Sequence, residues 1–129
     1  MSWYRDADFS QLTNVKVKHV SVVDGSIANL LLDDGRVAKI ELHGDCCSDS
    51  YFADPSQLFE LKDSTILEVE LREGASSDKL ETKNEEDYEV WKWHFLVFKT
   101  SAGHVTVDWR NESNGYYDGW PTLEFPASA

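Results

Sequence analysis

The stretch that decides the fold is YEVWKWHFLVFKT, residues 88 to 100. Its apolar side chains alternate between the two faces of an extended chain, with Trp91, Trp93, Phe95 and Val97 on one face and Val90, Leu96 and Phe98 on the other. A strand that is apolar on both faces belongs in the interior of a sheet. This segment therefore predicts the central strand of a β-rich domain.

Four further segments, residues 14–25, 27–42, 64–74 and 101–113, alternate apolar and polar residues as strands do. The alternation changes phase near His19, which predicts a bulge, and Asp34–Gly35 and Gly103 mark tight turns. Helical signals are confined to residues 6–13 and 54–61, where Asp54 can cap a helix and Pro55 fits its first turn. We predict a mainly β (α+β) fold, an antiparallel sheet of about five to seven strands with one or two short helices.

Length and charge limit the function classes. The 129 residues predict a single domain, residues 1–129. Twelve Lys and Arg against 24 Asp and Glu give a formal net charge of -12, which disfavours direct nucleic-acid and anionic-membrane binding. The first residues lack the basic and apolar regions of a secretory leader and no apolar run has membrane length, so we expect neither a leader nor a membrane span. The two adjacent cysteines cannot link distant segments by a disulfide. We expect a cytoplasmic protein.

Residues 72–89 form the most acidic part of the chain. Between Glu68 and Glu89 there are nine acidic residues and three basic ones. The segment is polar and poor in β-branched residues, so we predict a mobile loop between two strands. It is either a solvated loop that maintains solubility or an arm that engages a basic surface. In the second case the contacting carboxylates are Glu81, Glu85, Glu86, Asp87 and Glu89.

The only cysteines lie in HGDCCSDSYF, residues 43–52. His43, Asp45, Cys46 and Cys47 are the candidate thiol site, with a base such as His94 or His104 supplied from elsewhere. Zinc needs four converging ligands, whereas neighbouring side chains point apart, so we predict no metal and no cofactor. Buried packing of the two thiols is the simpler interpretation.

Aromatic residues concentrate in WRNESNGYYDGW, residues 109–120, where Asn114–Gly115 predicts a tight turn. Aromatic rings mixed with polar groups are typical of a recognition surface, and the candidate contact residues are Arg110, Asn114, Tyr116, Tyr117 and Trp120. The alternative is a loop whose aromatic rings fold back to cover the sheet. We also expect this segment and the cysteine pair to lie close together at one end of the sheet.

GDCCS at residues 44–48 and RNESNGYY at residues 110–117 together resemble an uncharacterised domain family of phage and bacterial genomes. The resemblance implies no reaction and transfers no catalytic residue. It implies a setting in which small phage proteins act on host machinery by binding. Residues 72–89 do not belong to the shared pattern.

These observations favour an interaction protein over an enzyme. We expect a phage-type acidic inhibitor, of anti-CRISPR kind, that occupies a basic, nucleic-acid-binding surface of a host defence protein. Carboxylates of residues 72–89 would stand where phosphates bind, as a nucleic-acid mimic, and Tyr116, Tyr117 and Trp120 would anchor the contact. A homodimer stays an open alternative. The alternative function is a small enzyme or ligand-binding protein that uses Cys46 or Cys47 with a histidine.

Overall fold

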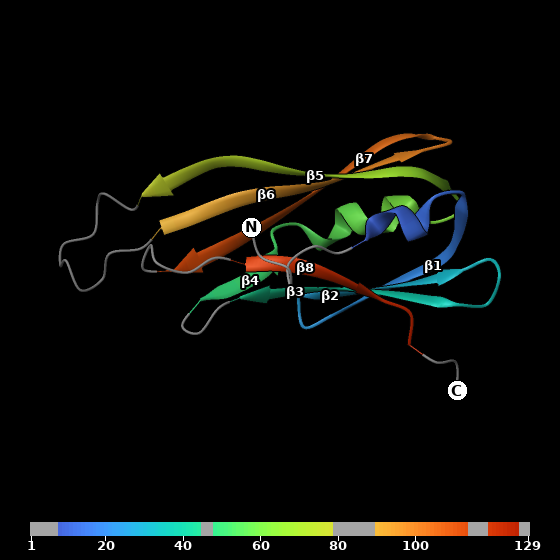
Figure 1. The fold of residues 1–129 in the computed structure, drawn as a ribbon, viewed down its shortest axis with the longest axis horizontal. Coiled ribbons are helices and arrows are strands. Elements are labelled where there is room, and N and C mark those ends of the chain that lie inside the picture. The colour runs from blue at the N-terminus through green and yellow to red at the C-terminus, as the bar shows by residue number, and fades with distance from the viewer. Residues whose placement is uncertain (1–7, 45–47, 79–89, 114–118, 127–129) are drawn as a thin grey trace.

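The computed structural model describes residues 8–44, 48–78, 90–113 and 119–126. Within these residues eight strands form one antiparallel sheet in the order β4-β7-β6-β5-β1-β2-β3-β8 (Figure 1). The strands are β1 (Val15–Val23), β2 (Ile27–Leu32), β3 (Val37–Gly44), β4 (Asp49–Phe52), β5 (Thr65–Asp78), β6 (Val90–Thr100), β7 (Gly103–Ser113) and β8 (Gly119–Glu124). Two 3₁₀ helices, η2 (Phe9–Leu12) and η3 (Pro55–Leu61), complete the described fold. The predicted mainly β class is confirmed, and the strands added to the prediction are β4 and β8.

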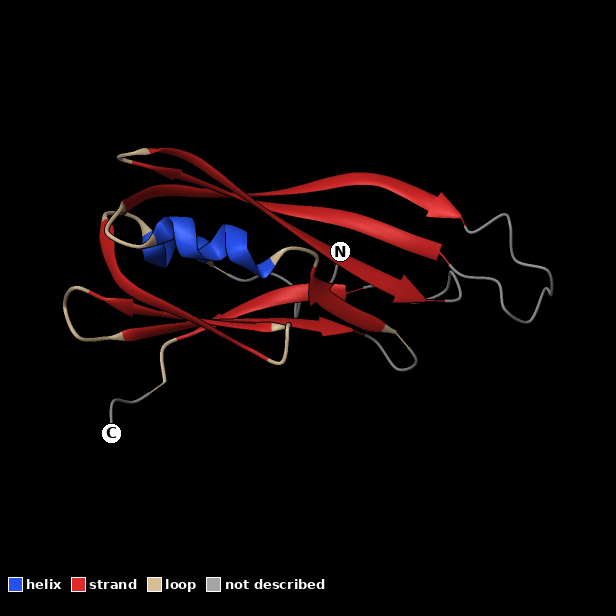
Figure 2. Ribbon diagram, turned by 180° about the vertical axis from the view of Figure 1, so that it is seen from behind, coloured by secondary structure: helices blue, strands red, loops and turns tan. Residues whose placement is uncertain are grey.

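The sheet folds into two layers that face each other, as Figures 1 and 2 show. One layer contains β5, β6 and β7, and the other contains β1, β2, β3 and β8. Strand β1 belongs to both, because Val15 and Lys16 pair with β5 whereas the residues from Val17 onward pair with β2. The register shifts between Val17 and His19, which confirms the predicted bulge.

Strand β6 lies between β5 and β7, as its sequence predicts. Leu96 and Phe98 point into the space between the layers and are fully buried. The opposite face, which we call the outer face of β5, β6 and β7, carries Trp93 and Phe95. Of the described side chains on that face of β6, Val97 is buried, Phe95 is half-buried and Trp93 is exposed. One apolar face of the central strand is therefore core and the other is surface.

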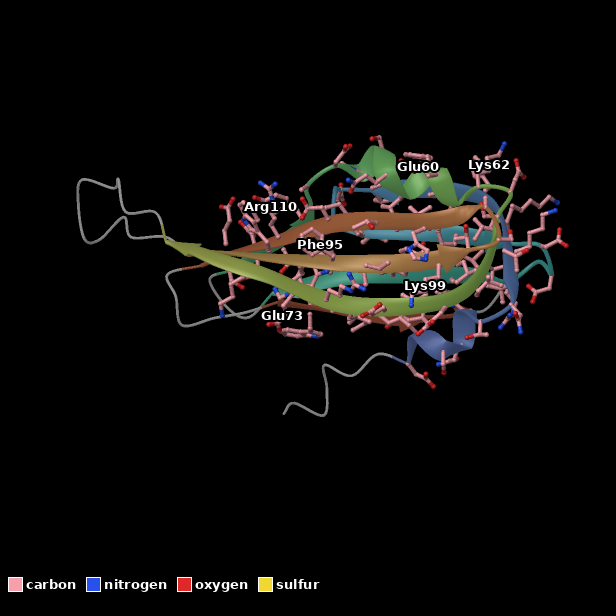
Figure 3. The ribbon with its side chains drawn as sticks, turned by 90° about the horizontal axis from the view of Figure 1, so that it is seen from above. Glu60, Lys62, Glu73, Phe95, Lys99 and Arg110 are labelled. Atoms are coloured by element: carbon pink, nitrogen blue, oxygen red, sulfur yellow. The ribbon has the colours of Figure 1, made fainter. Side chains whose placement is uncertain are left out.

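The turns and helix starts follow from local sequence. Gly35 (φ 92°) and Gly103 (φ 121°) adopt the positive φ that their hairpin turns require. The Asp54 side chain accepts a hydrogen bond from Ser56 N at 3.2 Å and so caps η3. Helix η3 is tied to β7, because Asp108 N donates to the Gln57 side chain at 2.9 Å. Figure 3 shows η3 beside β7 and η2 beside the opposite edge of this layer.

The core lies between the layers and under the two helices. Its fully buried large side chains are Leu12, Val17, Val20, Leu30, Leu32, Ile40, Leu58, Leu61, Ile66, Leu96, Phe98 and Val107. They come from both layers and both helices, so the described residues share one hydrophobic core.

The acidic segment differs from its prediction at its start. Residues 72–78 are strand, because β5 continues to Asp78 and pairs with β6 up to Val90. The pairing persists through a register shift between Glu73 and Ser76, a bulge that an alternation pattern does not reveal. The remaining residues, 79–89, lie outside the described part of the chain.

Candidate functional site

The two sequence motifs meet at one end of the sheet through a polar cluster centred on the buried Asn111. Asn111 of β7 is 0% exposed. Its Nδ2 donates hydrogen bonds to Ser50 Oγ at 3.0 Å and to Ser48 Oγ at 3.3 Å. Ser50 Oγ donates in turn to the His43 carbonyl at 2.8 Å. We call Asn111, Ser48, Ser50 and the His43 carbonyl the polar knot, which joins the ends of β3, β4 and β7.

Gly119, the first residue of β8, packs directly against the polar knot. A Cβ atom at residue 119 would stand 2.1 Å from Ser50 Oγ, 2.7 Å from the His43 carbonyl oxygen and 2.9 Å from Asn111 Nδ2. Only glycine fits at such separations, since the second of these atoms belongs to the backbone. The contact between Ser48 and Asn111 agrees with the expectation that the motifs lie close together. The Cys46 and Asn114 positions themselves lie outside the described residues.

His43, the described member of the candidate thiol site, already has two partners. Its Nε2 lies 2.8 Å from Thr122 Oγ1, and its ring stacks on Trp120 with centroids 5.8 Å apart. Asp45, Cys46 and Cys47 are not among the described residues. In the described ranges, no three His, Cys, Asp or Glu side chains gather as metal ligands would.

The outer side of β4, β6 and β7 carries a second group of polar and aromatic side chains. Arg110 lies over Trp93, with the guanidinium carbon 5.0 Å from the ring centre. Tyr51 donates a hydrogen bond to Glu112 Oε2 at 2.5 Å. Burial and this bond to a carboxylate raise the pKa of Tyr51 to about 12. We call Tyr51, Trp93, Phe95, Arg110 and Glu112 the outer patch.

Charged side chains frame the outer patch. Arg110 also pairs with Asp108, at 3.5 Å. On the β5 side, two guanidinium nitrogens of Arg72 donate to Glu70 at 3.0 and 3.2 Å, which lowers the pKa of Glu70 and raises that of Arg72. Lys99 lies 3.4 Å from Glu68 and 3.8 Å from Glu70. On this face, charge pairs thus surround the exposed Trp93 ring and the half-buried Phe95 ring.

A pocket of about 240 Å³ opens where β5, β6 and β7 approach β8. Its lining residues are Leu71, Arg72, Glu73, His94, Phe95, Trp109, Gly119, Trp120 and Pro121. His94 and Trp109 stack with centroids 4.1 Å apart. The pocket therefore has aromatic walls and charged side chains from β5.

The structure places the predicted contact residues in different parts of the molecule. Arg110 belongs to the outer patch, whereas Trp120 lies on β8 and lines the pocket. The other predicted contact residues, Asn114, Tyr116, Tyr117, Glu81, Glu85, Glu86, Asp87 and Glu89, fall outside the described residues. Sequence reasoning placed Trp93 and Phe95 on one face of a strand and did not assign them, Tyr51 or Glu73 to a site. The sequence pattern could have pointed to Trp93, because an apolar strand face that no other element covers is a candidate contact surface. No described element covers this face.

Comparisons with curated proteins and with solved structures give no match. No helix in the described part of the chain has the length and apolar character needed to cross a membrane. A family described as Domain of unknown function (DUF7448) matches residues 10–119, a range that contains every described strand except most of β8. The chain belongs to this uncharacterised domain family.

Proposed function

We propose that this chain is a binding protein whose outer patch contacts a basic surface on another protein. The observation that carries the proposal is the exposed Trp93 ring with the half-buried Arg110 guanidinium over it, on a sheet face that no described element covers. Trp, Tyr and Arg dominate the energetics of protein interfaces because they combine large contact area with directed hydrogen bonds. The outer patch contains one of each.

The geometry of the outer patch also limits the entropy that binding would cost. The Tyr51 hydroxyl is held by Glu112, and the Arg110 side chain is held by both Trp93 and Asp108. Side chains that are already fixed lose little rotamer freedom when a partner arrives. The patch is therefore preorganised for contact.

The charge of the chain and of its outer face indicates which kind of protein surface it would bind. The chain has a formal net charge of -12. On the outer face, Glu68, Glu70, Asp108 and Glu112 outnumber Arg72, Lys99 and Arg110. An excess of carboxylates steers the chain toward positively charged surfaces and discriminates against acidic ones. A basic protein surface is the complementary partner.

The finer form of the proposal concerns the identity of that partner. We infer a host protein in the cytoplasm of a bacterial cell, with this chain supplied by a phage. The contacted surface would be one that binds nucleic acid, such as that of a CRISPR effector, and occupying it would inhibit the effector. The carboxylates of residues 79–89 would then add to the contact as substitutes for phosphates. The net charge supports this form.

Capture from a bacterial lysate followed by binding titration tests the proposal. The test variant carries Trp93→Ala and Arg110→Ala together. The control carries Phe59→Ala and Lys62→Ala, which remove the same two kinds of side chain from exposed positions in and just after η3, where Phe59 is 49% exposed. Proteins captured by the unmodified chain and by the control, and lost with the test variant, are candidate partners.

Each candidate is then purified and titrated. We expect the test variant to bind at least about 30-fold more weakly, as loss of an interface anchor worth about 2 kcal/mol would give. Raising the salt from about 0.1 M to about 1 M should weaken binding further, since the Debye length falls from about 10 Å to 3 Å. A captured protein that binds the test variant and the unmodified chain equally would refute the proposal.

A further inference from the structure

We propose that the pocket between β5 and β8 receives the cationic end of an arginine or lysine side chain from the basic partner. This inference rests on the proposed function and adds to it a specific subsite. The pocket is separate from the Trp93 and Arg110 pair, and it draws Glu73 and Trp120 from two different layers of the sheet.

The walls of the pocket are suited to a cation on an apolar stem. Trp109 and Trp120 are both lining residues, and the exposed Leu71 adds aliphatic surface. Each tryptophan is held by a stacked histidine, His94 for Trp109 and His43 for Trp120. Ring faces attract guanidinium and ammonium groups through their quadrupole, and tryptophan does so most strongly.

The charge balance of the lining favours a positive ligand. Arg72 is engaged by both carboxylate oxygens of Glu70, so its charge is already balanced on the outer face. Glu73 pairs in the strand register with His94, which places it on the other face of β5, and it is exposed. Its side chain has no hydrogen bond or ion pair with the described residues. Glu73 is therefore the carboxylate available to the ligand.

The size of the pocket narrows the ligand further. Its volume of about 240 Å³ is below the roughly 300 to 1,000 Å³ typical of sites for drug-sized molecules. A side-chain end with part of its stem is a better match to this volume. An anion is disfavoured because Glu73 would repel it at the entrance.

Small probes test the pocket without the partner. N-acetyl-arginine methylamide is titrated into the full chain while the indole N–H signals of the five tryptophans are followed by NMR. The citrulline analogue is the neutral probe of nearly the same shape. We expect the arginine probe to shift the Trp120 signal with saturation, and the citrulline probe to bind about tenfold more weakly.

The matched variants are Glu73→Gln and Glu60→Gln. Both remove one exposed carboxylate, and Glu60 lies on η3, away from the pocket lining (Figure 3). We expect Glu73→Gln to weaken arginine-probe binding about five- to tenfold and Glu60→Gln to leave it unchanged. Urea unfolding of both variants checks that the fold is intact.

Three results would each overturn the inference: no saturable shift with the arginine probe, equal binding of the citrulline probe, or equal affinity of the two variants. Such a result would leave the outer patch untouched, because the probes contain no partner surface. Conversely, the double substitution Trp93→Ala with Arg110→Ala could leave partner affinity unchanged while the arginine probe still binds normally. That result would refute the proposed function and leave the pocket as a cation site.

Discussion

The polar knot and the outer patch share strands β4 and β7, and on these two strands they differ in the face to which their side chains point. Ser50 and Asn111 are paired across β4 and β7 and point inward, whereas the residues that follow them, Tyr51 and Glu112, point outward and bond to each other. A displacement of one residue along the strand thus changes a hydrogen-bond cluster centred on the fully buried Asn111 into a half-buried pair on the outer face.

The comparison shows how burial sets the role of similar polar groups. A hydrogen bond contributes about 1 kcal/mol on balance, but a buried donor left without an acceptor costs considerably more. The knot therefore stabilises the junction of three strands and tolerates little change. The outer patch lies at the surface, so its side chains can contact another protein without first giving up the interactions that hold them.

Replacing Asn111 by Asp should produce the largest effect. The change keeps the volume but removes the two Nδ2 hydrogen bonds and buries a charge. We expect the free energy of unfolding at pH 7 to fall by about 3 kcal/mol. Burial would raise the pKa of the new carboxyl above its unfolded value, so the loss should be greatest at neutral pH and shrink as acid protonates the group.

Asn29→Asp provides the control, because Asn29 is half-buried in β2 and the chemical change is identical. Urea unfolding at several pH values compares the two variants. If Asn111→Asp lowers the free energy of unfolding no more than Asn29→Asp does, the polar knot is no more sensitive to substitution than the rest of the sheet.

Gly119→Ala should rank second. The new Cβ would meet Ser50 Oγ and the His43 carbonyl, and we expect a loss of about 2 kcal/mol from overpacking. Adding Ser50→Ala removes the shortest of the three close contacts and leaves those with the His43 carbonyl and Asn111 Nδ2. The double variant should therefore be more stable than the sum of the single losses predicts, and strict additivity in thermal or urea unfolding would contradict the contact.

Tyr51→Phe should cost about 1 kcal/mol, because the lost hydrogen bond to Glu112 is only partly shielded from water. The pKa of Tyr51 is raised from 10.0 to about 12, first by burial and then by Glu112. Its contribution is therefore fully present below about pH 10 and is lost as the pH rises toward 12. Tyrosinate absorbance should show a late-titrating group that the Phe variant lacks.

Arg110→Ala should have the smallest effect on stability, about 0.5 kcal/mol, since its ion pair with Asp108 is partly exposed. The same change should weaken partner binding severalfold or more if the outer patch is an interface. A stability loss above about 2 kcal/mol would instead mean that the patch, like the knot, is structural.

The sequence predicts those features that depend on short-range pattern. The alternation of residues 90–98, the phase change at His19 and the Asp54–Pro55 helix start all appear in the structure as expected. Strand β8 escaped prediction because Pro121 lacks a backbone donor and usually marks a loop. Proline is tolerated there because β8 is the last strand of the sheet, where one edge has no neighbour in the described strand order. Strand β4 is only four residues long and too short to show a period.

The site was less predictable than the fold. Alternation shows that Trp93 and Leu96 lie on opposite faces, but it cannot show which face the rest of the chain covers. That choice depends on where β1 bends and where the other layer lies, which is a long-range property. The proximity of the two motifs was predicted from their loop-like composition, whereas the bonds of Asn111 required the strand register.

The sharing of β1 between the layers has a consequence for how the chain folds. The hairpins β2–β3 and β6–β7 close through short turns, so they can form locally within microseconds. Strand β1 becomes part of the second layer only when Val15 and Lys16 pair with Ile66 and Thr65, after a long stretch of intervening chain. Closing that loop costs conformational entropy, and the pairing of β1 with β5 that it allows consists of two residue pairs. Capture of the start of β1 by β5 is thus expected to be a late event, after the hairpins have already selected their registers.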